Sequence, residues 1–101
     1  MNNYSISQEA IHDLNEIADY LARQSIDASE RFVRRFAEKC RNLVNFPNMG
    51  RSYDDIFPNL RGLPLDNYII FYQVIKQDIE IVRVVSGYRD VKSLFLDDEE
   101  T

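Results

Sequence analysis

The residues of this sequence best able to bind an anionic group are cationic and phenolic side chains in its C-terminal half: Arg61, Arg83, Tyr88, Arg89 and Lys92. The planar fork of an arginine holds a phosphate or a carboxylate in a fixed geometry. Arg83 lies inside the apolar run 79–85, where an unpaired charge would be costly. We therefore expect Arg83 either to pair with Asp66, Asp90 or a backbone carbonyl, or to grip an anionic target.

Other catalytic groups are sparse. His12 is the only histidine, and beside Asp13 near a helix start it indicates a surface or capping residue rather than a base. Cys40 is the only cysteine, and its place on an apolar helical stripe indicates a buried thiol, because reactive thiols need an exposed electropositive setting. One histidine and one cysteine cannot close a zinc site, so we expect no metal and no cofactor. An enzyme here would have to act through arginine, lysine and tyrosine.

The composition indicates one folded domain over residues 1–96, followed by an acidic, disordered tail over 97–101. The net charge is −5, but leaving out the four acidic residues of the tail reduces the acidic count from 17 to 13, against 12 basic residues. This near-neutral body weighs against general binding to a phosphate backbone. No signal peptide or apolar span of membrane length is visible, so the sequence predicts a cytoplasmic protein with no membrane partner.

The N-terminal half predicts a short strand and two helices. Tyr4–Ile6 alternates like a strand, and Ser7 is a good N-cap for a helix with an apolar stripe from Ala10 to Leu21. Acidic residues displaced from that stripe should face solvent: Glu9, Asp13 and Glu16. The run 27–30 has the form of a capping box for a second helix, which should end before Pro47 and pack as a hairpin on the first.

The C-terminal half predicts strands over 60–63, 68–75 and 79–86, after an irregular loop over 47–58. The fold class is therefore α+β, with an N-terminal helical hairpin on a small antiparallel sheet. The strand 68–75 is apolar on both faces, so it should be central and covered on both sides. The helices can cover one face. The other would receive a partner segment, or a short C-terminal helix carrying Val91, Leu94, Phe95 and Leu96.

An ordered set of motifs resembles the ParE/RelE superfamily of toxins from type II toxin–antitoxin systems. The set comprises Ser7-x-x-Ala10-x-x-Asp13-Leu14-x-x-Ile17-x-x-Tyr20, Phe46-Pro47-x-x-Gly50-Arg51, Leu60-Arg61, Tyr68-x-x-Phe71-Tyr72 and Ile81-x-Arg83-Val84-x-x-Gly87-x-Arg89-Asp90. The resemblance leaves out only the acidic tail. The fold it implies, a helical hairpin on a mostly antiparallel sheet in the order β-α-α-β-β-β, agrees with the elements above.

The resemblance implies two modes of action. RelE-like members cut messenger RNA in the ribosome with basic residues and a tyrosine or histidine, whereas ParE-like members are associated with inhibition of DNA gyrase. Many members carry a histidine at about the place of Ser86, so a ribonuclease here would depend on Arg61, Arg83, Tyr88 and Arg89. The near-neutral body, the three lysines and the Phe-Pro-x-x-Gly-Arg junction favour the gyrase inhibitor, with Arg61, Arg83, Tyr88, Arg89 and Lys92 contacting the target.

The resemblance also implies an antitoxin that binds the toxin in a hetero-oligomer. We expect it to lay a helix and an extended segment over the sheet, with contacts at Phe71, Tyr72, Leu94 and Phe95. A third hypothesis, from a different class, is a non-toxic module whose binding to its partner is its only activity.

Overall fold

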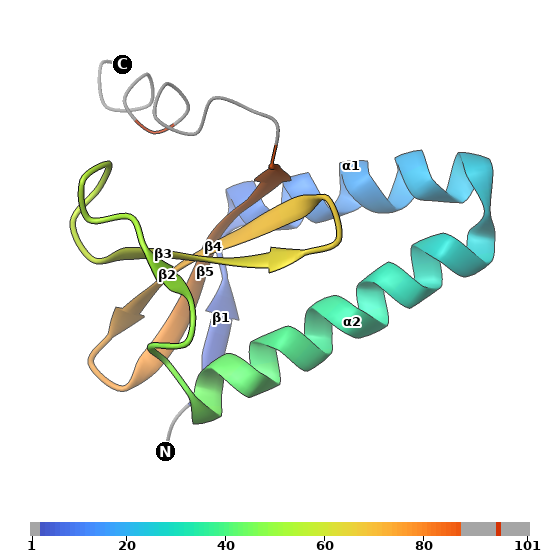
Figure 1. Cartoon of the computed structure of the whole chain (residues 1–101). Coiled ribbons are helices and arrows are strands. Elements are labelled where there is room, and N and C mark those ends of the chain that lie inside the picture. The colour runs from blue at the N-terminus through green and yellow to red at the C-terminus, as the bar shows by residue number, and fades with distance from the viewer. Residues whose placement is uncertain (1–2, 88–94, 96–101) are drawn as a thin grey trace.

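The computed structural model describes residues 3–87 and residue 95, and shows two helices on one side of a five-stranded sheet (Figure 1). The elements are β1 (Tyr4–Ile6), α1 (Gln8–Gln24), α2 (Ile26–Asn45), β2 (Arg51–Ser52), β3 (Leu60–Leu65), β4 (Tyr68–Ile75) and β5 (Asp78–Ser86). The predicted α+β class and element order are confirmed. The predicted tail over 97–101 lies outside the described residues. Within the described part, no helix is long and apolar enough to cross a membrane.

Two serines set the limits of the helical hairpin. Ser7 is the predicted N-cap of α1, and its Oγ accepts a hydrogen bond from the Ala10 N–H at 3.1 Å. Ser25 is the single residue between the two helices, and it caps both of them. Its N–H donates to Leu21 O at 2.8 Å at the end of α1, and its Oγ accepts from the Ala28 N–H at 3.2 Å at the start of α2. The predicted cap at Asp27 is therefore wrong. Asp27 instead lies in the first turn of α2, where a negative charge is favourable to the helix dipole.

The sheet has the order β1-β5-β4-β3-β2, in which only β1 and β5 run parallel. The predicted strand over 68–75 has the bounds of β4, while β3 extends two residues beyond the predicted strand 60–63. The loop predicted over 47–58 contains β2, which pairs Arg51 with Gly62 and Ser52 with Arg61. A strand of two residues shows no hydrophobic alternation, so the sequence pattern could not indicate it.

β4 is the central strand and is buried on both faces. Its residues Ile70 and Tyr72 face the helices in a core with Phe32, Phe36, Cys40 and Leu43. On the opposite face, Phe71 packs in a second core with Leu60 and Val85, covered by Tyr53, Phe57 and Phe95. The chain thus covers the second face itself over Phe71, and the sequence-based alternative of an open face that awaits a partner is corrected there.

A β-bulge in β5 explains why the apolar pattern of this strand is irregular. Phe71 pairs with Arg83 but Tyr72 pairs with Ile81, so Val82 is an extra residue on β5. The extra residue lets both Ile81 and Val84 enter the helix-side core, which a regular strand could not do at a spacing of three. Arg83 follows the bulge, just beyond Ile81, the last residue of β5 that pairs with β1.

Candidate functional site

Arg83 is held by a carboxylate from α1. Its Nε donates to Asp13 Oδ2 at 2.8 Å and its Nη2 donates to Asp13 Oδ1 at 3.1 Å, a two-point pairing. The side chains of Arg83 and Asp13 are only 16% and 9% exposed. Asp13 therefore does not lie in a solvent-facing acidic row, as expected from the sequence. The expectation of an internal partner for Arg83 is confirmed, but this partner is Asp13, while Asp66 pairs with Arg35.

Asp13 also completes the hydrogen bonding of β5 where β1 ends. Ser7 donates from its N–H to Ile81 O and from its Oγ to Val82 O, both at 2.9 Å. Beyond that point, Asp13 Oδ2 accepts the N–H of Val84 at 3.0 Å. One buried carboxylate thus holds an arginine and a strand edge together, and the charge of Arg83 is balanced inside the protein.

Arg61 organises the turn that follows α2. Its Nη1 donates to Gly50 O at 2.6 Å and to Asn48 O at 3.3 Å. From β4, Tyr72 OH donates to Pro47 O at 2.8 Å and accepts from the Gly50 N–H at 2.9 Å. Burial raises the pKa of Tyr72, although the hydrogen bond from Gly50 and the charge of Arg61 act in the opposite direction. The Phe-Pro-x-x-Gly-Arg motif is therefore a structural junction, closed by Arg61 and Tyr72.

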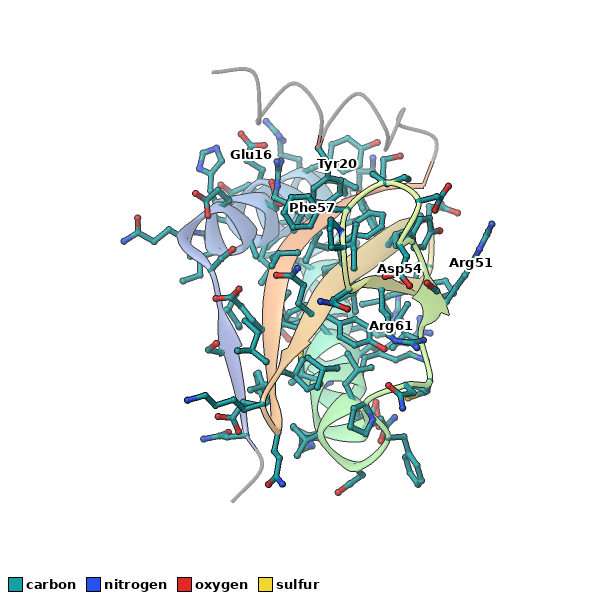
Figure 2. The ribbon with its side chains drawn as sticks, turned by 90° about the vertical axis from the view of Figure 1, so that its left-hand side faces the viewer. Glu16, Tyr20, Arg51, Asp54, Phe57 and Arg61 are labelled. Atoms are coloured by element: carbon teal, nitrogen blue, oxygen red, sulfur yellow. The ribbon has the colours of Figure 1, made fainter. Side chains whose placement is uncertain are left out.

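Arg61 also lines a polar pocket of about 170 Å³ on the β2 side of the sheet. Within residues 3–87 and 95, Arg61 donates to backbone carbonyls, and no carboxylate forms an ion pair with it. Figure 2 shows Arg61, Arg51 and Asp54 around this part of the sheet. Arg51 is exposed and its guanidinium lies 5.2 Å from the ring centroid of Tyr53. The margin around β2 thus carries two cations, the exposed Arg51 and the half-buried Arg61.

A substitution at Gly50 tests the junction that Arg61 and Tyr72 close after α2, because a side chain at this position would collide with Tyr72. A Cβ there would lie 2.6 Å from Tyr72 OH and 2.7 Å from Tyr72 Cε1. We expect Gly50→Ala to lower the free energy of unfolding by about 1–3 kcal/mol, since the Tyr72 ring must move and its hydrogen bonds weaken. The matched control is Gly87→Ala, where the nearest atom would be at 3.4 Å. Equal urea midpoints for the two variants would contradict this role of Gly50.

Ser86 lies beside a second pocket, of about 180 Å³, between α1 and the end of β5. This pocket is lined by Asp13, Glu16, Ile17, Tyr20, Tyr68, Val84, Val85 and Ser86. Burial, and then the neighbouring Tyr20, raise the pKa of Tyr68. Glu16 and Tyr20 are exposed on α1 (Figure 2). No arginine, lysine or histidine is among the described residues that line this pocket, so the lining offers no cation to a phosphate.

Two residues predicted to contact an antitoxin are in the core instead. Phe71 and Tyr72 have no exposed surface, because the helices cover one face of β4 and the 53–57 segment with Phe95 covers the other. Neither side chain presents surface to a partner in this structure, so the prediction that they contact an antitoxin has no support from their positions. Phe95 packs edge-on against Phe71 with ring centroids 5.3 Å apart. The other predicted site residues, Tyr88, Arg89, Lys92 and Leu94, lie outside the described residues.

The structure shows a basic surface on α2 that the sequence analysis did not identify. Arg31, Arg34, Arg35 and Arg41, with Ala37 and Glu38, line a hollow of about 390 Å³. In the described part of the chain, the only ion pair of α2 joins Arg35 to Asp66. The signal was present in the spacing, because residues 31, 34, 35, 38 and 41 share one face of a helix.

The remaining candidates have structural or surface roles. Cys40 is fully buried, and burial raises the pKa of its thiol to about 12, so the thiol stays protonated and unreactive at neutral pH. His12 is exposed and lies 3.1 Å from Glu16. Across residues 3–87 and 95, no group of three histidine, cysteine, aspartate or glutamate side chains could hold a metal ion.

Comparison with known proteins gives one family match and a similar fold. Residues 4–91 match the family model described as ParE toxin of type II toxin–antitoxin system, parDE. A solved structure described as a chromosomal ParDE TA system from P. aeruginosa is similar, with a TM-score of 0.69 and 22% identity, covering 85% of this chain and 95% of that chain. Because the sequence identity is only 22%, this similarity shows that the two chains share a fold and nothing further. No curated protein matches this sequence.

Proposed function

Because the chain belongs to the ParE toxin family of type II toxin–antitoxin systems, we propose that it inhibits DNA gyrase by binding to it in the cytoplasm. A cognate antitoxin neutralises it in a hetero-oligomer. The family covers residues 4–91, which include every described helix and strand.

The observation that favours binding over RNA cleavage concerns Arg61 and Arg83, the two candidate catalytic arginines within the described residues. Both make hydrogen bonds inside the protein. Cleavage of a phosphodiester needs cationic groups directed at the developing charge, together with an acid and a base. Arg83 is instead paired with Asp13, and Arg61 donates to the carbonyls of Asn48 and Gly50. Ser86 stands beside carboxylates and phenols. This arrangement supports a protein that acts by surface contact.

We place the gyrase-binding surface at the margin of β2 and β3. Arg51 is exposed there and lies over the ring of Tyr53, which restricts its conformations before binding. Arg61 is half-buried in the adjacent pocket. Tyr88, Arg89 and Lys92, from the segment after β5, remain proposed contacts. Arg83 is not proposed as one, because it already has a buried partner.

We place the antitoxin on the helical hairpin. Exposed large apolar side chains within or directly after the two helices are Ile11, Tyr20, Ile26, Val33 and Phe46, at 46%, 50%, 67%, 50% and 66% exposure. A partner helix that covers such side chains gains about 25 cal/mol for each Å² of apolar surface removed from water. Leu94 and Phe95 remain proposed antitoxin contacts.

The topology of a plasmid in cells that express the chain alone tests the proposed activity. Inhibition of gyrase should leave the extracted plasmid less negatively supercoiled, and growth should stop. Co-expression of the protein encoded by the adjacent reading frame should restore both. Unchanged plasmid topology in cells whose growth has stopped would contradict gyrase as the target.

Two alternatives give different results in the same cells. A RelE-like ribonuclease would cut messenger RNAs within translated regions, which primer extension detects, and would leave the plasmid supercoiled. A non-toxic binding module would leave growth, plasmid topology and messenger RNA unchanged while it still binds its partner.

A further inference from the structure

The basic surface of α2 has a composition unlike the rest of the molecule. Four of the six residues that line its hollow are arginines and one is a glutamate. The arginines Arg31, Arg34, Arg35 and Arg41 are all exposed. The complete chain, in contrast, carries a net charge of −5. Charge of one sign is therefore concentrated on one face of one helix, here called the arginine stripe and defined by the residues 31, 34, 35, 38 and 41.

Most of the arginines in the stripe are available to a partner. Within residues 3–87 and 95, Arg31, Arg34 and Arg41 form no ion pair, whereas Arg35 pairs with Asp66. They also make no contribution to the core of α2, which is formed by Phe32, Phe36, Cys40 and Leu43. Holding like charges together on one helix face costs free energy, and a partner of opposite sign would remove that cost.

The dimensions and charge order of the stripe identify the kind of partner. It runs from residue 31 to residue 41, ten steps along the helix, which is about 15 Å at a rise of about 1.5 Å per residue. Glu38 lies between Arg34 and Arg41, so the order along the helix is positive, negative, positive. A continuous polyanion would be repelled at Glu38. A peptide segment can instead place acidic residues opposite the arginines and a basic or polar residue opposite Glu38.

The other arm of the hairpin is unsuited to a nucleic acid. α1 carries the exposed carboxylates of Glu9, Glu16 and Asp19, against the basic residue Arg23. A duplex wide enough to span both helices would meet these carboxylates next to the arginines. A single polypeptide segment is narrow enough to follow α2 alone.

Building on the proposed function, we infer that the arginine stripe of α2 is the docking site for a carboxylate-rich segment of the antitoxin. Paired charges at the rim of an interface mainly accelerate association and give it a strong dependence on salt. The stripe therefore attracts the antitoxin to the helical hairpin, where the exposed apolar side chains complete binding.

A charge-reversed double variant tests the inference. We expect Arg34→Glu with Arg41→Glu to associate with the antitoxin from the adjacent reading frame on the order of tenfold more slowly at low salt. The difference should shrink as salt is raised. The matched control is Arg23→Glu with Lys76→Glu, which changes the net charge equally at exposed residues outside the stripe. The neutral pair Arg34→Gln with Arg41→Gln should give an intermediate rate, with an unchanged unfolding midpoint.

Several outcomes would overturn the inference. Equal slowing by the stripe and control variants would show an effect of net charge alone. If the Arg34→Glu with Arg41→Glu variant associated normally with the antitoxin but no longer bound a 20-base-pair duplex that the unaltered chain binds, the stripe would be assigned to nucleic acid. If removing residues 97–101 made association with the antitoxin about tenfold faster, the arginine stripe would be assigned to the chain's own acidic tail. If the unaltered chain bound no antitoxin, the proposed function would fail as well, whereas equal rates for all variants would overturn the stripe alone.

Discussion

Replacing Asp13 with alanine is expected to lower the free energy of unfolding by about 3–5 kcal/mol. The change would leave Arg83 with its charge in a site where its side chain is only 16% exposed. It would also remove the acceptor for the Val84 N–H at the edge of β5. A domain of this size is typically stable by about 5–15 kcal/mol, so the variant should be close to unfolding.

Urea unfolding followed by circular dichroism measures this effect. Glu16→Ala is the matched control, because Glu16 lies one turn along α1, is exposed and forms an ion pair with the exposed His12. Its exposed pair contributes less than about 1 kcal/mol. Joint replacement of Asp13 and Arg83 by leucine should recover part of the loss, since it removes the guanidinium together with the carboxylate that neutralises it. An Asp13→Ala protein as stable as Glu16→Ala would mean that the pair does not hold α1 to β5.

Replacing Phe71 with alanine is the second large effect, expected at about 3–5 kcal/mol. Phe71 is fully buried, with Tyr53 and Phe95 packed edge-on at 5.2 and 5.3 Å between ring centroids. Removing the ring would open a cavity in the smaller of the two cores. The loss would be in folding stability, in contrast to the role in antitoxin capture that the sequence indicated.

Phe46→Ala is the control for Phe71→Ala, because it removes the same ring from a side chain that is 66% exposed. Its free energy of unfolding should stay within about 0.5 kcal/mol of the value for the unaltered chain. If the antitoxin lies on the helical hairpin, Phe46→Ala should weaken antitoxin binding while Phe71→Ala mainly weakens folding. The reverse pattern would restore Phe71 as a docking residue.

The sequence was most informative where the pattern was local. Ser7 was identified as an N-cap, and β4 was predicted with its correct bounds, because capping and hydrophobic alternation depend on neighbouring residues. The burial of β4 on both faces also followed from its composition. The two-residue strand β2 and the cap at Ser25 were missed, because a short edge strand and a one-residue helix connection carry no periodic signal.

The site depended on contacts that are distant in the sequence. Asp13 and Arg83 are 70 residues apart, and they meet because α1 packs on β5, which no local pattern in the sequence shows. Helical periodicity placed Asp13 on the solvent side, since a pattern of apolar residues cannot show that a charged residue has a buried partner. The arginine stripe was visible as a spacing, but its lack of partners on α1 required the structure.

These positions separate the scaffold from the surfaces that meet other molecules. Asp13, Arg83, Gly50 and Tyr72 hold the helical hairpin, the turn after α2 and the sheet together. The β2 margin and the arginine stripe are exposed and lie on different elements. We therefore expect substitutions at Arg51 and in the arginine stripe to weaken the proposed gyrase contact and the proposed antitoxin contact separately.

The most direct test of the account is a titration of the purified chain into DNA gyrase acting on relaxed plasmid, beside a translation reaction that contains messenger RNA. We predict that supercoiling falls as the chain is added, that the antitoxin restores it, and that the messenger RNA stays intact. Full supercoiling activity together with cleaved messenger RNA would contradict the account.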